Sequence, residues 1–241
     1  MRVATPQRPV PEGEQGVGES GGESLLKVAV VTGGHAFDVI GFHVLWRSYD
    51  ELDCYVQSLE DWAIDRVRRN VQYDVVVFYT MHTDLPENCP GGKHTRAAIN
   101  SLGDGAGIVV MHHGILAFLG DPVWDDVVGM TDRTIDGYSH DEQLSIRVED
   151  PSHPVTSGVH DWSMIDETYD FRDVESEDSH VLLTVEHENS LSTMAWARQY
   201  KASRVLNFVF GHDNQTWVDE TFRNVLGRGI RWVGTGSTSV R

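Results

Sequence analysis

The segment that most constrains the fold runs from Gly107 to Leu116. A run of small and apolar residues, Gly107 to Met111, passes directly into His112-His113-Gly114, and a helix is expected to follow. A continuous apolar run of this length is typical of a strand buried on both faces, as in a parallel sheet. Such a strand presents the residues that follow it at the carboxyl edge of the sheet, where open α/β folds place their sites. The pattern therefore predicts an α/β fold with two imidazoles at that edge.

Three other apolar runs alternate with helix-length segments. The runs cover residues 25–31, 73–79 and 204–210, and helices are predicted near residues 42–49, 59–70, 92–102 and 219–233. This alternation predicts a mainly parallel sheet with right-handed crossovers and helices on both faces. Between about Asp121 and Val185, short extended runs and turn signals break the alternation. We expect this segment to be an insertion over the carboxyl edge of the sheet.

The ends of the chain differ in composition from the remainder. Residues 1–24 are rich in Gly, Pro, Glu and Ser and contain few apolar side chains, which predicts a disordered tail. Residues 25–241 are long enough to form one α/β domain, and no internal repeat divides them. We therefore expect a single domain after the tail.

The chain is strongly acidic, with a net charge of −18. Its only lysines are Lys27, Lys93 and Lys201, so arginine supplies almost all of the positive charge. An acid-rich, lysine-poor surface is suited to a salty cytoplasm, where ions screen the repulsion between carboxylates, and it favours a halophilic source over an ordinary acidic protein. The absence of a basic stripe also disfavours binding to nucleic acid.

Other classes of protein are disfavoured by what the chain lacks. No apolar run approaches the roughly 20 residues of a membrane-spanning helix, so no membrane partner is expected. Cys54 and Cys89 are too few for a disulfide framework, and no secretory signal is recognisable, which together favour the cytoplasm. No Gly-x-Gly-x-x-Gly follows the first strand and no Walker sequence occurs, so we expect no nucleotide cofactor.

Several histidines and their polar neighbours follow predicted strand ends, at His35, Tyr79 to His82, His112-His113 and His212-Asp213. Any one of these histidines alone has an ordinary structural explanation. Together they predict one shared site, because the carboxyl ends of parallel strands meet at the same edge. Glu167, in the insertion, is the carboxylate expected to complete the site as a metal ligand or general base, although Asp166 and Glu167 also fit ordinary surface acids.

The roles expected at this site follow from side-chain chemistry. We assign catalysis to His112, Glu167 and His212, and metal binding to His112, His113, Glu167 and His212. A divalent metal, with zinc as first choice, suits such a set of imidazoles and a carboxylate. Substrate binding is assigned to His35, Tyr79, His82, Trp124, Tyr169 and Asp213. His140 and His153, in the insertion, are left open between a site role and a structural role.

A nucleophilic mechanism is not expected. The turn after residue 111 lacks Ser and Cys, and Cys89 lies in a Pro/Gly-rich loop away from it.

Five short stretches, taken in order and spacing, resemble the ThuA-like (trehalose utilisation) family, which is related to class I glutamine amidotransferases. They are Val31 to His35, His112 to Gly114, His153 to Gly158, Asp166 to Tyr169, and Gly211 to Asp213. The resemblance covers about residues 25–233. It implies a flavodoxin-like fold in which His112 takes the place of the nucleophilic cysteine of the amidotransferases. His212 is implied to lie near the place of their catalytic histidine, and hydrolysis of glutamine through a thioester is then excluded.

Two functions fit these observations. The first is an enzyme of carbohydrate metabolism, dependent on a metal or on histidines, whose implied substrates are trehalose, related disaccharides or oxidised sugars. The second is a non-catalytic sugar-binding or regulatory module on an amidotransferase-like scaffold. In either case the expected partner is a small-molecule sugar, with Trp124, Trp162 and Trp217 as candidate stacking surfaces, and a homo-oligomer is left open.

Overall fold

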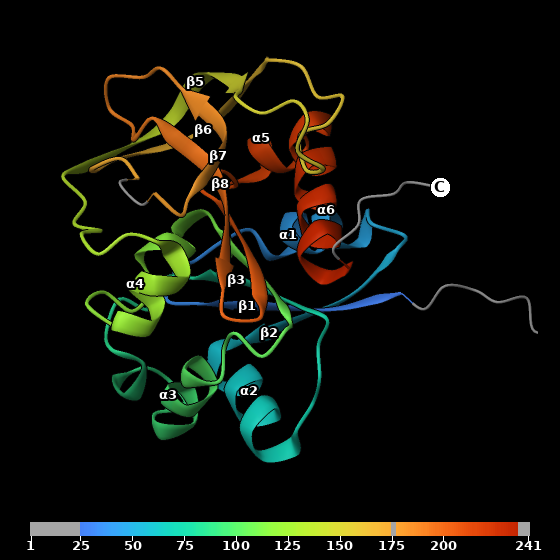
Figure 1. Cartoon of the computed structure of the whole chain (residues 1–241), viewed down its shortest axis with the longest axis vertical. Helices are drawn as coiled ribbons and strands as arrows, with labels where there is room; N and C mark the ends of the chain where they lie inside the picture. Colours follow the sequence, from blue (N-terminus) through green and yellow to red (C-terminus); the bar gives the residue numbers. More distant parts are fainter. Residues whose placement is uncertain (1–24, 175–176, 236–241) are drawn as a thin grey trace, which may run out of the picture.

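A computed structural model describes residues 25–174 and 177–235, so the tail predicted for residues 1–24 lies outside the described residues. The described strands form one nine-stranded sheet in the order β2-β1-β3-β4-β9-β8-β7-β5-β6 (Figure 1). The first five strands of this order are parallel: β2 (Leu52–Ser58), β1 (Leu26–Gly33), β3 (Val75–Thr80), β4 (Gly107–Met111) and β9 (Ser203–Phe208). The predicted α/β class is confirmed, and the predicted apolar runs form the parallel part of what is, as a whole, a mixed sheet.

The four remaining strands are antiparallel and continue the same sheet beyond β9. They are β8 (Thr193–Tyr200), β7 (His180–Val185), β5 (Gly137–Val148) and β6 (Trp162–Asp170). The insertion predicted between about residues 121 and 185 thus extends the sheet sideways, and only parts of it reach the carboxyl edge. The apolar signal is weaker here because β5 has many exposed positions and because β6 buries polar side chains, among them Asp166 and Glu167.

One parallel strand, β2, was absent from the sequence prediction. It is an edge strand that pairs with β1 alone among the described strands, and its residues between Leu52 and Ser58 alternate polar and apolar side chains. Edge strands commonly carry charged residues because one side is open to water. The continuous apolar run used to find the other parallel strands is therefore missing here.

Helices cover both faces of the parallel strands, as predicted. Helices α1 (Val39–Arg47) and α6 (Glu220–Thr235) lie on one side in Figure 1, and α2 (Leu59–Ile64) and α3 (Lys93–Asn100) lie on the other. Helix α4 (Pro122–Val128) packs against β8 and β9. The helical stretch after Leu59 ends in a short π-helix, Asp65–Arg69. No helix in the described ranges combines the length and apolar character needed to cross a membrane.

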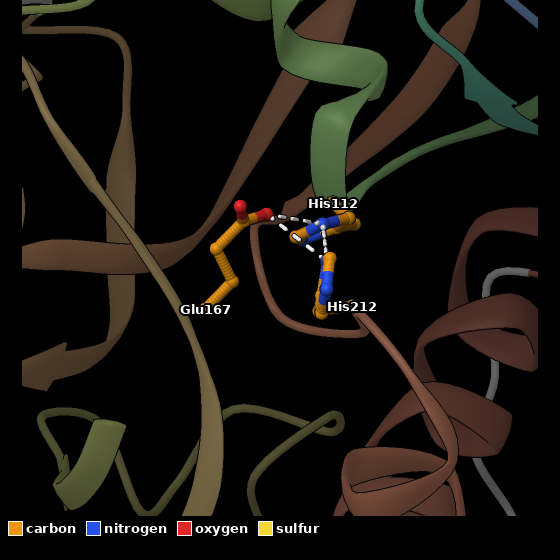
Figure 2. Close-up of side chains that lie close together, drawn as sticks. All are labelled: His112, Glu167 and His212. Atoms are coloured by element: carbon orange, nitrogen blue, oxygen red, sulfur yellow. Dashed lines mark hydrogen bonds and ion pairs between the residues drawn. The ribbon is translucent and has the colours of Figure 1, made fainter. Parts of the chain in front are cut away.

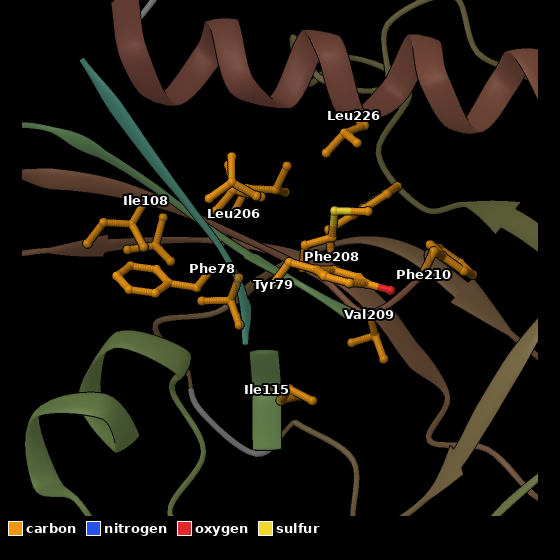
Figure 3. Packing of buried hydrophobic residues seen from close by; sticks show 14 of the residues in the cluster. Phe78, Tyr79, Ile108, Ile115, Leu206, Phe208, Val209, Phe210 and Leu226 are labelled. Carbon is orange, nitrogen blue, oxygen red and sulfur yellow. The ribbon is translucent and has the colours of Figure 1, made fainter. Parts of the chain in front are cut away.

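The core lies where α6 packs on β4 and β9. Leu206 and Phe208 of β9 are buried on the face of the sheet that α6 covers, where Leu226 of the helix is also buried (Figure 3). Gly107 permits this close packing, because a Cβ added there would lie 2.6 Å from the backbone of Val233. The core therefore holds the ends of β3, β4 and β9 in fixed positions, and these ends carry the polar cluster described next.

Candidate functional site

Three side chains from distant parts of the chain meet at the carboxyl ends of the parallel strands: His112, Glu167 and His212 (Figure 2). The Nε2 atom of His112 lies 3.0 Å from Oε2 of Glu167. The Nδ1 atom of His212 lies 3.1 Å from the same carboxylate oxygen and 3.3 Å from Nε2 of His112. Two imidazoles and one carboxylate therefore direct one atom each toward a common point.

His112 occupies the sharp turn that follows β4. Its φ of +51° lies in the left-handed region, which non-glycine residues seldom adopt, and it begins a 3₁₀ turn, His112–Leu116, where the sequence had predicted a helix. Gly114 makes the turn possible, because a Cβ there would lie 2.3 Å from the carbonyl oxygen of Phe78. Strained residues of this kind persist where the surrounding structure holds them, and they cluster at functional sites.

The tautomer of His112 follows from its buried partner. Its Nδ1 lies 3.0 Å from the carbonyl oxygen of Val209, and a carbonyl can only accept, so Nδ1 carries the proton. In the neutral ring, Nε2 then bears a lone pair that faces Glu167 and His212. A backbone carbonyl that accepts from the far nitrogen commonly fixes the orientation of a metal-binding histidine.

Glu167 comes from β6 and is 5 % exposed. Burial raises the pKa of its carboxyl, but the adjacent imidazoles of His112 and His212 outweigh this and hold the pKa well below its usual value. The hydrogen bond to Glu167 raises the pKa of His212 against the opposing effect of burial. A carboxylate and a proton-bearing imidazole are therefore favoured at this point of the site.

The loop that carries His212 is fixed at its backbone. The buried carboxylate of Asp166 accepts hydrogen bonds from the N–H groups of Gly211 and His212, at 2.8 and 3.0 Å, and from that of Glu167. The hydroxyl of Tyr79 donates to the carbonyl of His212 at 3.1 Å. Asp166 thus ties together the two segments that carry Glu167 and His212.

Tyr169 lies beside the three clustered side chains, also on β6. Its hydroxyl is 3.0 Å from Nε2 of His112, and its ring stacks against that imidazole. Burial raises the pKa of Tyr169 well above its usual value, and the nearby Glu167 adds to the shift. The hydroxyl is therefore a neutral hydrogen-bond donor at the edge of the cluster.

The predicted fourth ligand, His113, does not converge with the other three. Its ring is 1 % exposed and packs against the rings of Tyr79 and His35, at centroid distances of 4.2 and 5.0 Å. Neither ring nitrogen has a hydrogen-bond partner among the described residues. Burial, with the neighbouring imidazoles of His112 and His35, lowers the pKa of His113 well below its usual value. A neutral imidazole behind the cluster fits these observations better than a ligand.

The other predicted polar residues lie around the cluster at different depths. The exposed ring of His35 is 6.5 Å from that of His212. His82 is half-buried beside Gly33, where an added Cβ would lie 2.8 Å from its Nε2. Asp213 caps the short helix α5 (Asn214–Trp217) by accepting from the N–H of Gln215. His35 is thus the one of these three with an exposed side chain beside the cluster.

The tryptophan predicted to bind substrate is in the core. Trp124 is fully buried, contacts the rings of Phe78 and Phe118, and donates from Nε1 to the carbonyl of Gly114. No face of this indole is open to a sugar, so the prediction for Trp124 is wrong. Its place in an amphipathic helix, α4, explains the burial.

The two other tryptophans considered as stacking surfaces are not open aromatic platforms either. Trp217 is 2 % exposed and donates to the carbonyl of Gly211, and Trp162 is partly buried against the core.

His140 joins the cluster, whereas the sequence left its role open. Its Nδ1 lies 3.3 Å from Oε1 of Glu167, and its ring is 4.7 Å from that of His212. His153 lies elsewhere, where Nδ1 accepts from the N–H of Val155 and the ring stacks on His180. His140 lies within β5, where pairing with β6 places it opposite Glu167, whereas His153 lies in a turn between two prolines.

Within the described ranges, cavities and thiols do not point to a second centre of this chemistry. A cavity of about 570 Å³ between α4 and β8 is lined by acidic and arginine side chains and by none of the cluster residues. The thiol of Cys89 is buried against the carbonyls of Asp84 and Leu85, and burial raises its pKa to about 11.

Comparisons with solved structures show the same fold in other proteins. A protein described as ThuA-like from Parabacteroides merdae ATCC 43184 is 18 % identical with a TM-score of 0.67, over 90 % of this chain and 92 % of its own. A second ThuA-like protein, from Bacteroides uniformis ATCC 8492, is 17 % identical with a TM-score of 0.64, over 90 % and 95 % of the two chains.

A more distant similarity is to a cytoplasmic protein from Salmonella typhimurium. It is 15 % identical with a TM-score of 0.57, over 86 % of this chain and 99 % of its own. These identities support the fold alone. None of the curated proteins matches the sequence.

A family model described as ThuA, trehalose utilisation, matches residues 27–233, which include the turn at His112, the strand that carries Glu167 and the loop at His212. The match spans most of the chain and agrees with the structural similarities, so this chain belongs to the ThuA family, whose fold is of the glutamine amidotransferase type.

Proposed function

We propose that this protein is an enzyme of carbohydrate utilisation that holds a divalent cation between His112, Glu167 and His212. Membership of the ThuA family relates the chain to the utilisation of carbohydrate. The metal, the reaction and the sugar are inferred from the geometry of the three side chains and from the chemistry of their atoms.

The separations of the three donor atoms carry this proposal. Zinc binds nitrogen and oxygen at roughly 2.0–2.2 Å in tetrahedral sites, which places neighbouring ligand atoms about 3.4 Å apart. The three separations here are 3.0, 3.1 and 3.3 Å. A shift of a few tenths of an ångström would therefore admit the ion, and the tautomer of His112 already directs a lone pair toward it.

The donor set also suits a catalytic site better than a structural one. Structural zinc sites use four protein ligands, whereas catalytic sites commonly use three and leave a position for water or substrate. A bound cation would act as a Lewis acid on a sugar oxygen or lower the pKa of a bound water. The chain itself supplies Tyr169 as a neutral donor beside the cluster and His140 on the outer oxygen of Glu167.

The substrate class follows from the family and from the turn after β4. We propose a disaccharide or an oxidised sugar, and we exclude glutamine hydrolysis through a thioester because the turn carries an imidazole in place of a thiol. The acid-rich, lysine-poor composition further leads us to propose a cytoplasmic protein of a cell with high internal salt.

A non-catalytic sugar-binding module is the second candidate. The observation in its favour is that a proton on Nδ1 of His212 lies within hydrogen-bond distance of both Nε2 of His112 and Oε2 of Glu167, so both acceptors have a donor without a metal. In such a module the imidazoles would bind sugar hydroxyls and no metal would be needed.

Metal analysis of the purified protein, expressed without a histidine tag, separates the two. We expect about one zinc or other divalent ion per chain, and loss of the ion in His112→Ala and Glu167→Gln with the native fold retained. His43→Ala, which lies on α1 away from the cluster, serves as the control. A wild-type protein that takes up no divalent ion from a metal-supplemented buffer contradicts the enzyme proposal and favours the module.

A further inference from the structure

The strand next to Glu167 is interrupted by a β-bulge. Ser139 pairs with Thr168 and Glu142 pairs with Asp166, so two residues of β5, His140 and Asp141, lie opposite Glu167 alone. Asp141 has a φ of +59°, in the left-handed region. Bulges redirect side chains and are frequent beside active sites. Here the bulge is placed directly opposite the carboxylate of the proposed metal site.

The bulge brings His140 to the outer side of that carboxylate. The oxygen Oε2 of Glu167 faces the two other clustered histidines, while Oε1 lies 3.3 Å from Nδ1 of His140. The side chain of His140 remains 51 % exposed, compared with 7 % for that of Glu167. The imidazole therefore stands between the buried carboxylate and solvent.

The bulge is anchored at its far side. The side-chain amide of Gln215 donates to the carboxylate of Asp141, and α5 is in turn linked to α1 through Asn214 and Asp38. These links join the bulge to the helix that directly follows His212. The position of His140 is thus set by the same loop that carries a proposed ligand.

An exposed aromatic side chain lies beside His140. Tyr138 is 63 % exposed, and its ring is 5.3 Å from the imidazole of His140. Its pairing partner on β6 is Tyr169, which contacts His112. The exposed ring of Tyr138 and the exposed imidazole of His140 thus lie side by side next to the buried cluster. An apolar face with a polar group at its edge is typical of a sugar-binding surface.

We propose that Tyr138 and His140 form the substrate-contacting surface of the site, with Tyr138 packing on the face of a pyranose ring and His140 donating a hydrogen bond to one of its hydroxyl groups. The inference rests on the proposed function for its substrate class. The aromatic contact that the sequence predicted for Trp124 is thus assigned to Tyr138, beside the bulge.

The test measures sugar binding and metal content separately in the full-length protein. The probes are trehalose, maltose, cellobiose and methyl α-glucoside, followed by saturation-transfer NMR and calorimetry with and without added zinc. We expect millimolar binding of at least one probe, at least tenfold weaker binding in Tyr138→Ala and in His140→Ala, and near wild-type binding in Tyr138→Phe, which keeps the ring. Tyr55→Ala, an exposed tyrosine on the edge strand β2, is the matched control.

The outcomes separate this inference from the metal proposal. Zinc content unchanged in Tyr138→Ala, together with lost sugar binding, supports a substrate surface distinct from the ligands. If the wild-type protein binds no metal yet sugar binding still depends on Tyr138 and His140, the metal proposal fails and the surface stands. If no probe binds the wild-type protein, or if both alanine variants bind as tightly as wild type, the surface assignment is overturned.

Discussion

The parallel and antiparallel halves of the sheet contribute to the site in different ways. The parallel half supplies His112 and His212 from turns beyond the ends of β4 and β9. The antiparallel half supplies Glu167 from within β6 and His140 from within β5, which pairs with it. Strand ends can be recognised in a sequence, but the side chain that a paired strand directs toward a site depends on register. Two of the four site residues can therefore be predicted from strand ends in the sequence, and the other two depend on how the strands pair.

The two halves also differ in charge. Residues 137–200, which contain the four antiparallel strands, carry 14 acidic and three basic side chains, so 11 of the chain's 18 net negative charges fall on about a quarter of its length. The parallel strands β3 and β4 are buried throughout. We therefore expect the stability of the parallel half to depend mainly on packing. The stability of the antiparallel half should be reduced by electrostatic repulsion.

Removing a core aromatic side chain should have the largest effect, and it tests the packing of the parallel half. Trp124→Ala should lower the free energy of unfolding by about 3–5 kcal/mol, because it removes a buried indole and leaves a cavity beside Phe78. Trp162→Ala, in the partly exposed β6, should cost less than half as much. Denaturant unfolding measures both. Equal losses would show that the two halves are packed alike.

The next effect tests the link between the halves. Asp166→Asn replaces a carboxylate that accepts three backbone hydrogen bonds, and we expect about 10- to 100-fold weaker metal binding, as for other residues that orient ligands. Asp161→Asn is the control, because Asp161 accepts from the N–H of Val148 within the antiparallel half only. Competition with a chromogenic chelator measures the affinities. Unchanged metal affinity in Asp166→Asn would remove Asp166 from the positioning of His212.

The smallest effect tests the difference in charge. Raising KCl from low to molar concentration should stabilise the protein by about 1–2 kcal/mol, or roughly 2–8 °C in unfolding temperature, as repulsion is screened. Hydrogen exchange should slow more in β5 to β7 than in β3 and β4, because the acidic side chains are concentrated in the antiparallel half. A flat salt profile would favour an ordinary acidic protein, and equal slowing would contradict an electrostatic difference between the halves.

What could be predicted from the sequence follows from local signals. The strands β1, β3, β4 and β9 are continuous apolar runs, because each is buried on both faces, and their order with the intervening helices predicted the fold class. The histidines after those runs were recognised as one group because parallel strands end at a common edge. The motifs at His112 and His212 also carried the resemblance to the ThuA family, which the family match confirms.

The tertiary structure alone decided which of these side chains face one another. Trp124 and Tyr138 are both aromatic residues near polar neighbours in sequence, yet one is enclosed in the core and the other is exposed beside the cluster. The convergence of His140 on Glu167 depends on a single extra residue in β5, counted against a partner strand some 25 residues away. Apolar periodicity reports how deeply a segment is buried, whereas register, bulges and turn geometry are settled only when the partner strand is in place, and these determine which atoms meet at the site.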